Sequence, residues 1–410
     1  MSPIQLSQPA RKRYQAIRSL PELQAHLQWA VALELSTIPP YLCALYSITD
    51  AANVAATLVR SVVIEEMLHM MLASNLLNAV GASPKLSGDF VAKYPTYLPH
   101  HAAGGPYIQL QPLSPALALT TFMAIEQPEA SPNVPAEGDY YQTIGQFYKA
   151  IELGFRHLVA EHGEKWLFDH DTGCQRGDTY FGGGGGHLVV VHDLGSALCA
   201  LQEITEQGEG AAWPQPPVPG QEPFGGYESY GIRQDGSYGP ILGVPWELSH
   251  YNKFKQLAGG TVAVPPVYPM QANPDTAQLQ GEVRRLSELC DACYGLVLSA
   301  LEKALGTRDG QVDFFGVAFP VMQFVLPPLA ALLMQTSLLP EADPSLGPNA
   351  GPSFEPRTQP VAEIVRLAAD LLAAPPADRG SDYATLWVAT LGPVTAALRQ
   401  AAAVAGDPAL

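Results

Sequence analysis

The sequence predicts an all-α protein built from long, apolar helices. Apolar residues recur at helical spacing through most of the chain, whereas the alternating pattern that marks a half-buried strand is scarce. Glycine and proline, 37 and 38 residues in all, gather between the periodic stretches and end them. With 47% hydrophobic and 15% charged residues, the chain is apolar enough to fold around a large core.

The first predicted helix, from about 20 to 37, carries a glutamate among apolar residues. Pro39 and Pro40 follow it, and because neither can donate a helical hydrogen bond, we expect an interruption or kink before a helical segment resumes at 41–48. Glu34 lies one turn before that kink. A carboxylate in such surroundings must be paired, protonated or bound to a metal, because burying it alone is costly.

The second predicted helix, 54–80, is long and apolar and ends at Gly81, a residue type that favours helix termination. Glu66 and His69 interrupt an apolar face that otherwise has the pattern of a core-facing seam. Glu65 points about 100° away from Glu66 on a helix. We therefore expect Glu66 to be the inward partner of His69.

Further helices are expected along the rest of the chain. The next one begins at Ser114-Pro115, an N-cap followed by a first-turn proline, and ends at Glu126 before Pro128. The others span 140–168, 187–207, 246–257, 276–305, 315–339, 361–374 and 383–405.

These helices fall into two predicted regions. A helical bundle spans 18–260, and a C-terminal helical region, 270–405, packs on it. Within the bundle, 211–245 is rich in Pro, Gly and Tyr, which is typical of a loop excursion, and we interpret it as a candidate lid over a pocket. The apolar stretch 324–339 is short and contains two prolines, so a buried helix is expected there and not a membrane span.

Charge and cysteine content exclude several classes of protein. The net charge of −17 leaves no basic patch to neutralise phosphates, so neither nucleic acid nor a membrane is an expected partner. Five cysteines are few and odd in number, which indicates a reducing compartment. Cys290 and Cys293 lie within a helical pattern, which favours packed cysteines over metal or redox use. The N-terminus lacks the pattern of a signal peptide, so a cytoplasmic location is predicted.

Two Glu-x-x-His tetrads, Glu66 to His69 and Glu247 to His250, are the features most informative about function. Residues three apart share a helix face, so each tetrad can direct one carboxylate and one imidazole at a single point. One such tetrad alone is most often a surface pair. The other acidic residues on the predicted helices therefore decide the interpretation.

The candidate ligands on four predicted helices supply four carboxylates and two imidazoles, the set that a dinuclear carboxylate centre in a four-helix bundle requires. They are Glu34, Glu66, His69, Glu206, Glu247 and His250. Glu126 is a rival of Glu206, as ligand or as a supporting residue, and Glu203 and Glu209 are further alternatives. A buried salt bridge at Glu34 and an exposed helix end at Glu206 are the competing structural explanations.

Segments around these residues resemble the ferritin-like, iminophenyl-pyruvate dimer synthase family, which includes part of the long dimer synthases of violacein and rebeccamycin-type pathways. The resemblance extends from about residue 20 to 355. The segments are 33–42 (LELSTIPPYL), 65–70 (EEMLHM), 75–79 (NLLNA), 122–126 (FMAIE), 144–148 (IGQFY), 206–210 (EQGEG), 249–254 (SHYNKF) and 350–355 (AGPSFE).

The resemblance implies a ferritin-like bundle and oxidative chemistry on amino-acid-derived imines. We expect an enzyme with two Fe, or Mn, that uses O2 on a small amino-acid-derived or aromatic metabolite in secondary metabolism. The long dimer synthases are associated with haem, so a haem-linked imine dimer synthase is one alternative. A non-catalytic metal-binding or scaffold protein is another. The sequence leaves open the substrate and the choice between Fe and Mn. It also leaves open the oligomeric state, for which a homo-oligomer is one candidate.

Overall fold

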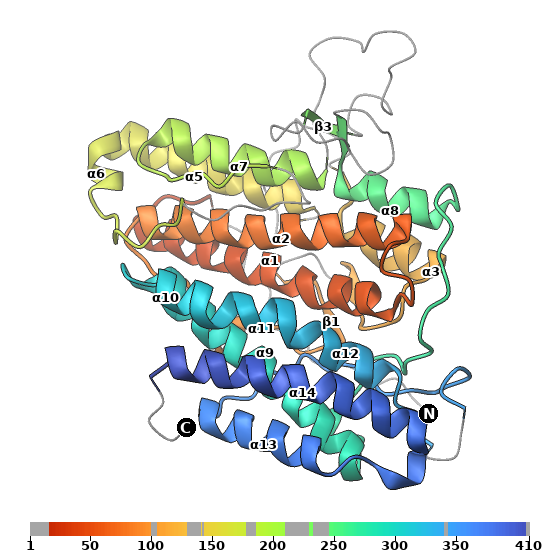
Figure 1. The fold of residues 1–410 in the computed structure, drawn as a ribbon. Helices are drawn as coiled ribbons and strands as arrows, with labels where there is room; N and C mark the ends of the chain where they lie inside the picture. The colour runs from red at the N-terminus through yellow and green to blue at the C-terminus, as the bar shows by residue number, and fades with distance from the viewer. Residues whose placement is uncertain are drawn as a thin grey trace, which may run out of the picture.

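Long helices account for nearly all of the fold (Figure 1). The computed structural model describes residues 16–99, 105–128, 141, 143–177, 186–209, 229–232, 246–339 and 343–406. The long helices are α1 (Leu20–Ser47), α2 (Val54–Ala79), α5 (Ile144–His162), α7 (Leu194–Gly208), α9 (Gly281–Gly306), α13 (Val361–Ala373) and α14 (Ser381–Val404). The shorter helices are α3 (Pro115–Leu117), α4 (Met123–Ile125), α6 (Glu164–Phe168), α8 (His250–Ala258), α10 (Gln311–Asp313), α11 (Phe319–Phe324) and α12 (Leu326–Met334).

Other regular structure in the described residues is confined to short segments. Two π-helical turns span Ala118–Phe122 and Phe314–Ala318, and 3₁₀ turns span Gly88–Phe90, Thr276–Gln278 and Ala377–Arg379. The strands pair in two antiparallel ribbons, β1 (Thr96–Tyr97) with β2 (Tyr107–Ile108), and β3 (Ser229–Ile232) with β4 (Trp246–Leu248). The predicted all-α class is confirmed.

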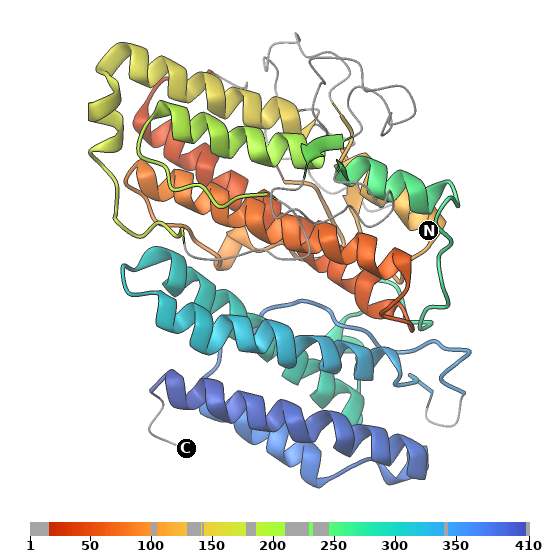
Figure 2. The same ribbon diagram turned by 45° about the horizontal axis from the view of Figure 1, so that its top comes forward.

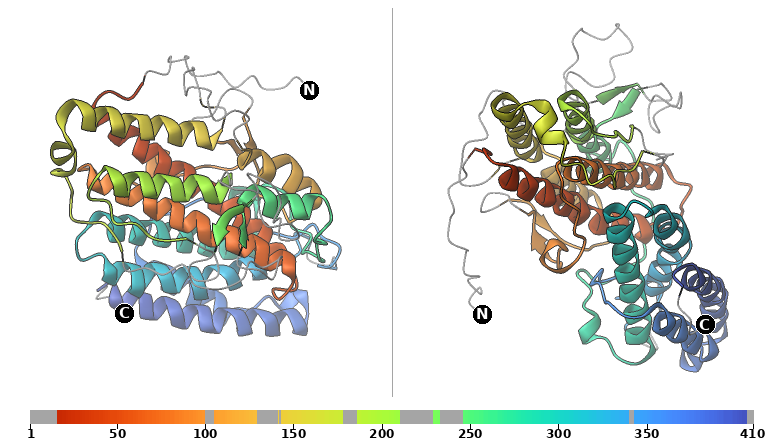
Figure 3. Two further views of the ribbon diagram at one scale, coloured as in Figure 1. Left: turned by 90° about the horizontal axis from the view of Figure 1, so that it is seen from above. Right: turned by 90° about the vertical axis from the view of Figure 1, so that its left-hand side faces the viewer.

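Most of the long helices stack in layers with similar axis directions, and α9 crosses its neighbours obliquely (Figures 1 and 2). α5 and α7 cover one side of the α1–α2 pair, and α9 and α12 contact the pair from the other side. α13 and α14 pack on α9, α11 and α12, and the right-hand view of Figure 3 shows them at the edge farthest from α5 and α7. Because the α1–α2 pair is covered on both sides, polar side chains at its centre are removed from water.

α1 continues through Pro39 and Pro40, so the predicted interruption of the helix was wrong. A proline in a helix leaves the carbonyl four residues earlier without its amide donor. For Pro40 that carbonyl is Ser36 O, and the hydroxyl group of Tyr94 donates to it at 2.7 Å. A side chain from outside the helix thus replaces the missing backbone donor, and the helix carries Glu34 and Tyr41 into the same core.

Two other predicted helices differ from the observed elements. The helix predicted at 187–207 begins only at Leu194, because the Asp193 side chain accepts from Ser196 N and Asp193 N donates to Ser196 Oγ, which together form a capping box. The helix predicted at 140–168 divides at Gly163, whose φ of 88° breaks the helical path between α5 and α6.

The helix predicted at 246–257 begins at residue 250, because Trp246–Leu248 is β4. The backbone of β4 pairs with β3, and this pairing aligns Glu247 with Gly231. Long-range pairing therefore overrides the local helical pattern before Ser249, the N-cap of α8. Most of the predicted excursion 211–245, and with it the candidate lid, lies outside the described residues.

The region after residue 270 forms its own helical layers, while its definition as a separate unit stays a prediction. Trp387 of α14 is wholly buried and donates from Nε1 to Leu371 O of α13 at 2.7 Å. Among the described residues, one helical run, Gln311–Met334, is long and apolar enough by length and composition to cross a membrane, and 56% of its apolar window is buried inside the protein.

Candidate metal centre

A cluster of buried acidic and imidazole side chains lies where the middle of α1 and α2 meets the ends of α4 and α7 and the start of α8. We call it the carboxylate–imidazole cluster, and its members are Glu34, Glu66, His69, Glu126 and His250. Each of them is at most 4% exposed. Three separate stretches of sequence, around residues 34–69, 126 and 250, therefore meet at one point inside the protein.

Each carboxylate of the cluster is held on one side by a hydroxyl group. The donor–acceptor pairs are Tyr148 Oη to Glu34 Oε1, Thr37 Oγ1 to Glu66 Oε2 (2.5 Å) and Tyr41 Oη to Glu126 Oε1 (2.5 Å). Burial raises the pKa of Tyr41 and Tyr148 well above the ordinary value, so both phenols stay protonated donors. The second oxygen of each carboxylate is left facing the two imidazole rings.

Both imidazoles are held from behind through Nε2. His69 Nε2 donates to Gln207 Oε1 at 2.7 Å, and His250 Nε2 donates to Glu65 Oε2 at 2.9 Å. The two rings lie 5.3 Å apart between centroids and 25° from parallel. Because Nε2 carries the hydrogen in both rings, Nδ1 is the nitrogen presented to the carboxylates.

The Nδ1 atoms and carboxylate oxygens surround a common space, and three of their four close pairs lie beyond hydrogen-bond distance. His69 Nδ1 lies 3.6 Å from Glu34 Oε2 and 3.7 Å from Glu66 Oε1, beyond hydrogen-bond distance. His250 Nδ1 lies 2.8 Å from Glu66 Oε1 and 3.6 Å from Glu126 Oε2. Among the described residues it has no partner of hydrogen-bond geometry, although it is buried. Ligand atoms of Glu66, His69 and His250 all lie within 4.8 Å of one another. Carboxylate oxygen and imidazole nitrogen suit iron and manganese, so the donor set fits a metal.

The electrostatics of the cluster also favour an added cation. Burial raises the pKa of Glu34 to about 7. Burial, reinforced by the charge of Glu126, raises the pKa of Glu66 to about 7 as well. Although burial lowers the pKa of His250, the surrounding carboxylates raise it well above the ordinary value. The metal-free cluster thus retains protons that a divalent cation displaces on binding.

Glu65 is wholly buried beside the cluster and pairs with a lysine. Lys253 Nζ donates at 2.6 Å to the same Glu65 oxygen that accepts from His250. Burial acts to raise the pKa of Glu65, but the charges of Lys253 and His250 outweigh it and hold the pKa below the ordinary value. Glu65 is therefore ionised, and its carboxylate accepts the hydrogen bond from His250 Nε2, the ring nitrogen that faces away from the cluster.

Comparison with known proteins identifies the family of this chain. The sequence profile of the family described as ferritin-like matches residues 27–259. The chain belongs to the ferritin-like family. The matched region contains most of α1, all of α2, α5, α7 and α8, and every member of the carboxylate–imidazole cluster. The prediction of a ferritin-like helical bundle is confirmed.

The ferritin-like chain is also similar to a curated protein and to a solved structure. It is 26% identical to the 2-imino-3-(indol-3-yl)propanoate dimerase of Chromobacterium violaceum, over 78% of this chain and 32% of the dimerase. The chain thus matches about a third of the length of that relative. A crystal structure of a ferritin-like protein from Caulobacter vibrioides matches with a TM-score of 0.56 and 25% identity, over 77% of this chain and 96% of that one. The predicted resemblance to a dimer synthase is confirmed.

The structure brings together four of the predicted ligands and the alternative candidate Glu126. The four are Glu34, Glu66, His69 and His250. Glu66 faces the two rings, as expected from its position on α2. That these residues bind metal stays a prediction.

The structure does not bring Glu206 into the carboxylate–imidazole cluster, and its role as a metal ligand stays a prediction. Its half-buried carboxylate accepts from Gln202 Nε2 at 2.6 Å. Consecutive helix residues point about 100° apart, so it is Gln207, the next residue, that faces His69. α7 therefore directs an amide at the cluster, and Glu126, the alternative candidate, lies near His250 instead.

The remaining predicted acids have other surroundings. Glu203 Oε1 accepts from Gln207 Nε2 at 3.3 Å, so it orients the amide that faces the cluster. Glu209 Oε1 accepts from Gly145 N at 2.8 Å. Glu247 lies in β4 and does not share a helix face with His250, which corrects the second tetrad. The Glu247 side chain lies outside the described residues, and its role as a ligand stays a prediction.

Sequence reasoning missed the residues that support the cluster. They are Thr37, Tyr41, Glu65, Tyr148, Gln207 and Lys253. One signal was available, since Lys253 follows His250 by three residues and so shares its face on α8. The hydroxyl and amide groups gave no comparable signal, because each contacts a cluster residue on a different element of the fold.

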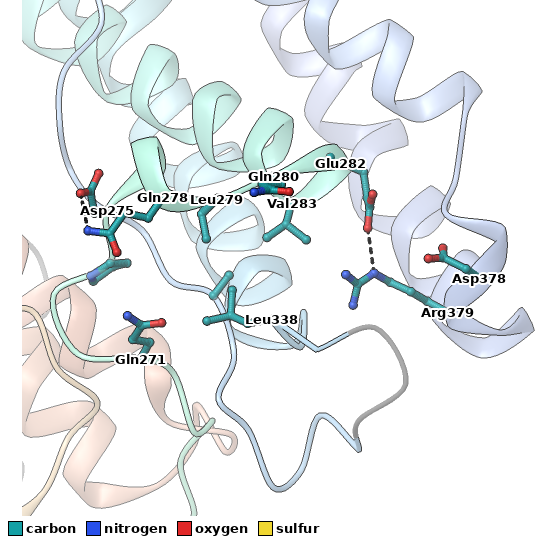
Figure 4. Close-up of a pocket in the computed structure, with 13 residues that line it drawn as sticks. Gln271, Asp275, Gln278, Leu279, Gln280, Glu282, Val283, Leu338, Asp378 and Arg379 are labelled. Atoms are coloured by element: carbon teal, nitrogen blue, oxygen red, sulfur yellow. Dashed lines mark hydrogen bonds and ion pairs between the residues drawn. The ribbon is translucent and has the colours of Figure 1, made fainter.

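A separate cavity of about 590 Å³ lies at the start of α9 (Figure 4). Gln271 and Asp275 line one side, and Arg379, which donates from Nε to Glu282 Oε1 at 3.0 Å, lines the other. No member of the carboxylate–imidazole cluster lines it. On α9 itself, Cys290 is buried and burial raises the pKa of its thiol.

Proposed function

We propose that this chain is a dinuclear non-haem iron oxidase or oxygenase that uses dioxygen on a small amino-acid-derived imine or a related aromatic metabolite. The observation that carries the proposal is the buried space onto which two imidazole Nδ1 atoms and three carboxylates converge, with His250 Nδ1 left without a partner of hydrogen-bond geometry among the described residues. The ferritin-like family supports the metal, and the dimerase relative, named for the imine of an aromatic amino acid, supports the substrate class. Manganese suits the same ligands.

The residues divide naturally between two ions. Glu34 and His69 would bind one ion, Glu126 and His250 the other, and Glu66, which lies near both rings, would bind between them. Bound iron would supply the redox chemistry that reduces dioxygen at the expense of the substrate.

The protein itself supplies position and a dry environment. Hydroxyl groups fix one oxygen of each carboxylate, and Gln207 and Glu65 fix the rings through Nε2. Such supporting contacts orient ligands before the metal arrives. The burial of every cluster member excludes bulk water from the reacting groups, which strengthens each electrostatic interaction there.

The test is anaerobic reconstitution of the metal-free chain with Fe(II), followed by metal analysis and an optical spectrum. Oxygen consumption is then followed with a tryptophan-derived imine generated in situ. The proposal expects about two irons per chain, as in other dinuclear carboxylate bundles. Glu126→Gln should lose iron and oxygen consumption, whereas Glu206→Gln, a matched change at a half-buried glutamate outside the cluster, should retain both.

The proposal has distinct ways to fail. Reconstituted protein without bound iron would contradict it, and so would equal iron content in the Glu126→Gln and Glu206→Gln variants. A haem absorption band in the purified protein would favour the haem-linked alternative. Stable binding of two irons without oxygen consumption on any imine would leave a metal-binding protein and would overturn the enzymatic part.

A further inference from the structure

The carboxylate–imidazole cluster consists of two similar halves around Glu66. We define the His69 half as Glu34 with His69, and the His250 half as Glu126 with His250. Glu66 Oε1 lies 3.7 Å from His69 Nδ1 and 2.8 Å from His250 Nδ1, so it is shared by both halves.

The carboxylates of the two halves are supported in the same way. Tyr148 donates a phenolic hydrogen to Glu34, and Tyr41 donates one to Glu126. Both tyrosines are wholly or almost wholly buried. These contacts therefore give neither half an advantage as a metal ligand.

The imidazoles of the two halves are supported differently. His69 Nε2 donates to the neutral amide oxygen of Gln207, whose orientation is fixed by donation from its Nε2 to Glu203 at 3.3 Å. His250 Nε2 donates instead to the carboxylate of Glu65, which is held in place by the ammonium group of Lys253 at 2.6 Å. Each of Glu65, His250 and Lys253 is wholly buried, so the difference in charge is not screened by water.

From this difference we propose that the two metal positions are unequal and that the His250 half binds the first divalent ion more tightly than the His69 half binds the second. The inference rests on the proposed function, because it concerns the same metal centre. A ring whose N–H donates to a carboxylate is a more basic ligand than one whose N–H donates to an amide. Lys253 lies on the far side of the carboxylate from the ring, so it moderates this effect and keeps the carboxylate in place.

The geometry of the shared carboxylate favours the same order. Glu66 Oε1 lies 2.8 Å and Glu126 Oε2 lies 3.6 Å from His250 Nδ1. The two oxygens nearest to His69 Nδ1 lie at 3.6 and 3.7 Å. The donors of the His250 half are therefore the more closely gathered. An ion that enters this half first finds its ligands closer to their bound arrangement, which lowers the cost of binding.

The test is anaerobic titration of the metal-free chain with Mn(II), followed by electron paramagnetic resonance. The expected result is two binding steps whose dissociation constants differ at least tenfold. Up to one equivalent, the spectrum should be that of isolated Mn(II), and a spin-coupled pair should form only with the second equivalent. His69→Ala should retain the tight step, whereas His250→Ala should retain only weak binding.

Two further variants separate the supporting contacts from the ligands. Glu65→Gln combined with Lys253→Met removes both charges behind His250 without leaving either one unpaired, and should weaken the tight step about 10- to 100-fold. Gln207→Leu removes the amide behind His69 and should weaken only the second step. Circular dichroism of the metal-free variants checks that both fold.

The outcomes distinguish this inference from the proposed function. Absence of any bound Mn(II) or Fe(II) in the wild-type chain overturns both. Two ions that bind with one dissociation constant, or as a coupled pair from the first addition, overturn the unequal positions and leave the dinuclear centre standing. Loss of the tight step in His69→Ala but not in His250→Ala reverses the assignment and also overturns the inference.

Discussion

Asp291 shows how a single buried acid between the two helix cysteines Cys290 and Cys293 can be stabilised without a metal. Its carboxylate exposes no surface and accepts hydrogen bonds from Ser353 at 2.5 Å and from Thr276 at 2.7 Å. The pattern Cys-x-x-Cys suggested a packed helix, and both thiols are buried in α9. The acid that separates them was not singled out, because its partners lie far from it in the sequence.

The Asp291 carboxylate makes the stability of the protein depend on pH. Burial raises its pKa from 3.8 to about 6, so the folded state binds this proton more tightly than the unfolded state. The stability it contributes is full below pH 3.8 and is lost as the pH rises through about 6. Relative to Asp291→Asn, wild-type protein should lose about 1.4 kcal/mol between pH 5 and 7. Urea denaturation at both pH values measures this, and parallel changes in the two proteins would contradict it.

Glu65 and Glu66 illustrate what sequence reasoning can resolve at the scale of a residue. Helical spacing correctly selected Glu66 as the carboxylate near His69. The same reasoning placed Glu65 on a different face, and the structure agrees. What spacing cannot reveal is that α8 covers that second face and brings Lys253 to it, because this depends on the packing of distant elements.

At the scale of the element, helix boundaries with local causes were predictable and those with distant causes were not. The start of α3 at Ser114 and the end of α2 before Gly81 follow from capping chemistry encoded nearby. The unbroken course of α1 through Pro39 and Pro40 depends on Tyr94, which lies outside the helix. Nothing in the sequence around the prolines predicts that contact.

The contact between Tyr94 and α1 can be tested directly. Tyr94→Phe leaves the buried carbonyl oxygen of Ser36 without its donor, so the free energy of unfolding should fall by about 1–3 kcal/mol. Tyr97→Phe is a matched control, because Tyr97 is 55% exposed, and its effect should stay within about 0.5 kcal/mol. Chemical denaturation measures both values. An equal loss in the two variants would show that the hydroxyl group of Tyr94 does not support the helix.

At the scale of the whole molecule, the candidate metal centre joins elements of the ferritin-like region and leaves the last helices untouched. Ligand candidates come from α1, α2, α8 and the end of α4, whereas α13 and α14 pack on the far side of α9 and α12. A metal ion that binds only the folded state should therefore stabilise the helices of the first group more directly than α13 and α14.

Hydrogen exchange with and without Mn(II) tests this expectation. At a free metal concentration 100 times the dissociation constant, the folded state should gain about 2.7 kcal/mol. Amide exchange should slow most in α1, α2 and α8 and least in α13 and α14. Thermal unfolding of the same samples provides the matching shift in midpoint. Equal slowing throughout the chain would show instead that all helices open together.

The overall fold was predictable because it follows from many repeated local signals, while the site depends on a few distant contacts. Helical periodicity and the family resemblance both indicated a ferritin-like bundle, which the match over residues 27–259 confirms. Glu34, Glu66 and His69 lie on two adjacent helices. They were predicted as candidate ligands because each interrupts an otherwise apolar helical segment. The choice between Glu126 and Glu206 was not decidable from sequence, because it depends on which helix end reaches the core.

The order of the cluster residues along the chain sets the order in which they are synthesised. Glu34, Glu66 and His69 leave the ribosome early, whereas His250 follows after about 180 further residues, which takes roughly 9 to 36 s at common rates of synthesis. The half with the proposed higher affinity is thus the last to be completed. A nascent chain holds an incomplete set of donors throughout that interval, so the proposed centre would have its full set of ligands only after the region up to α8 has been synthesised.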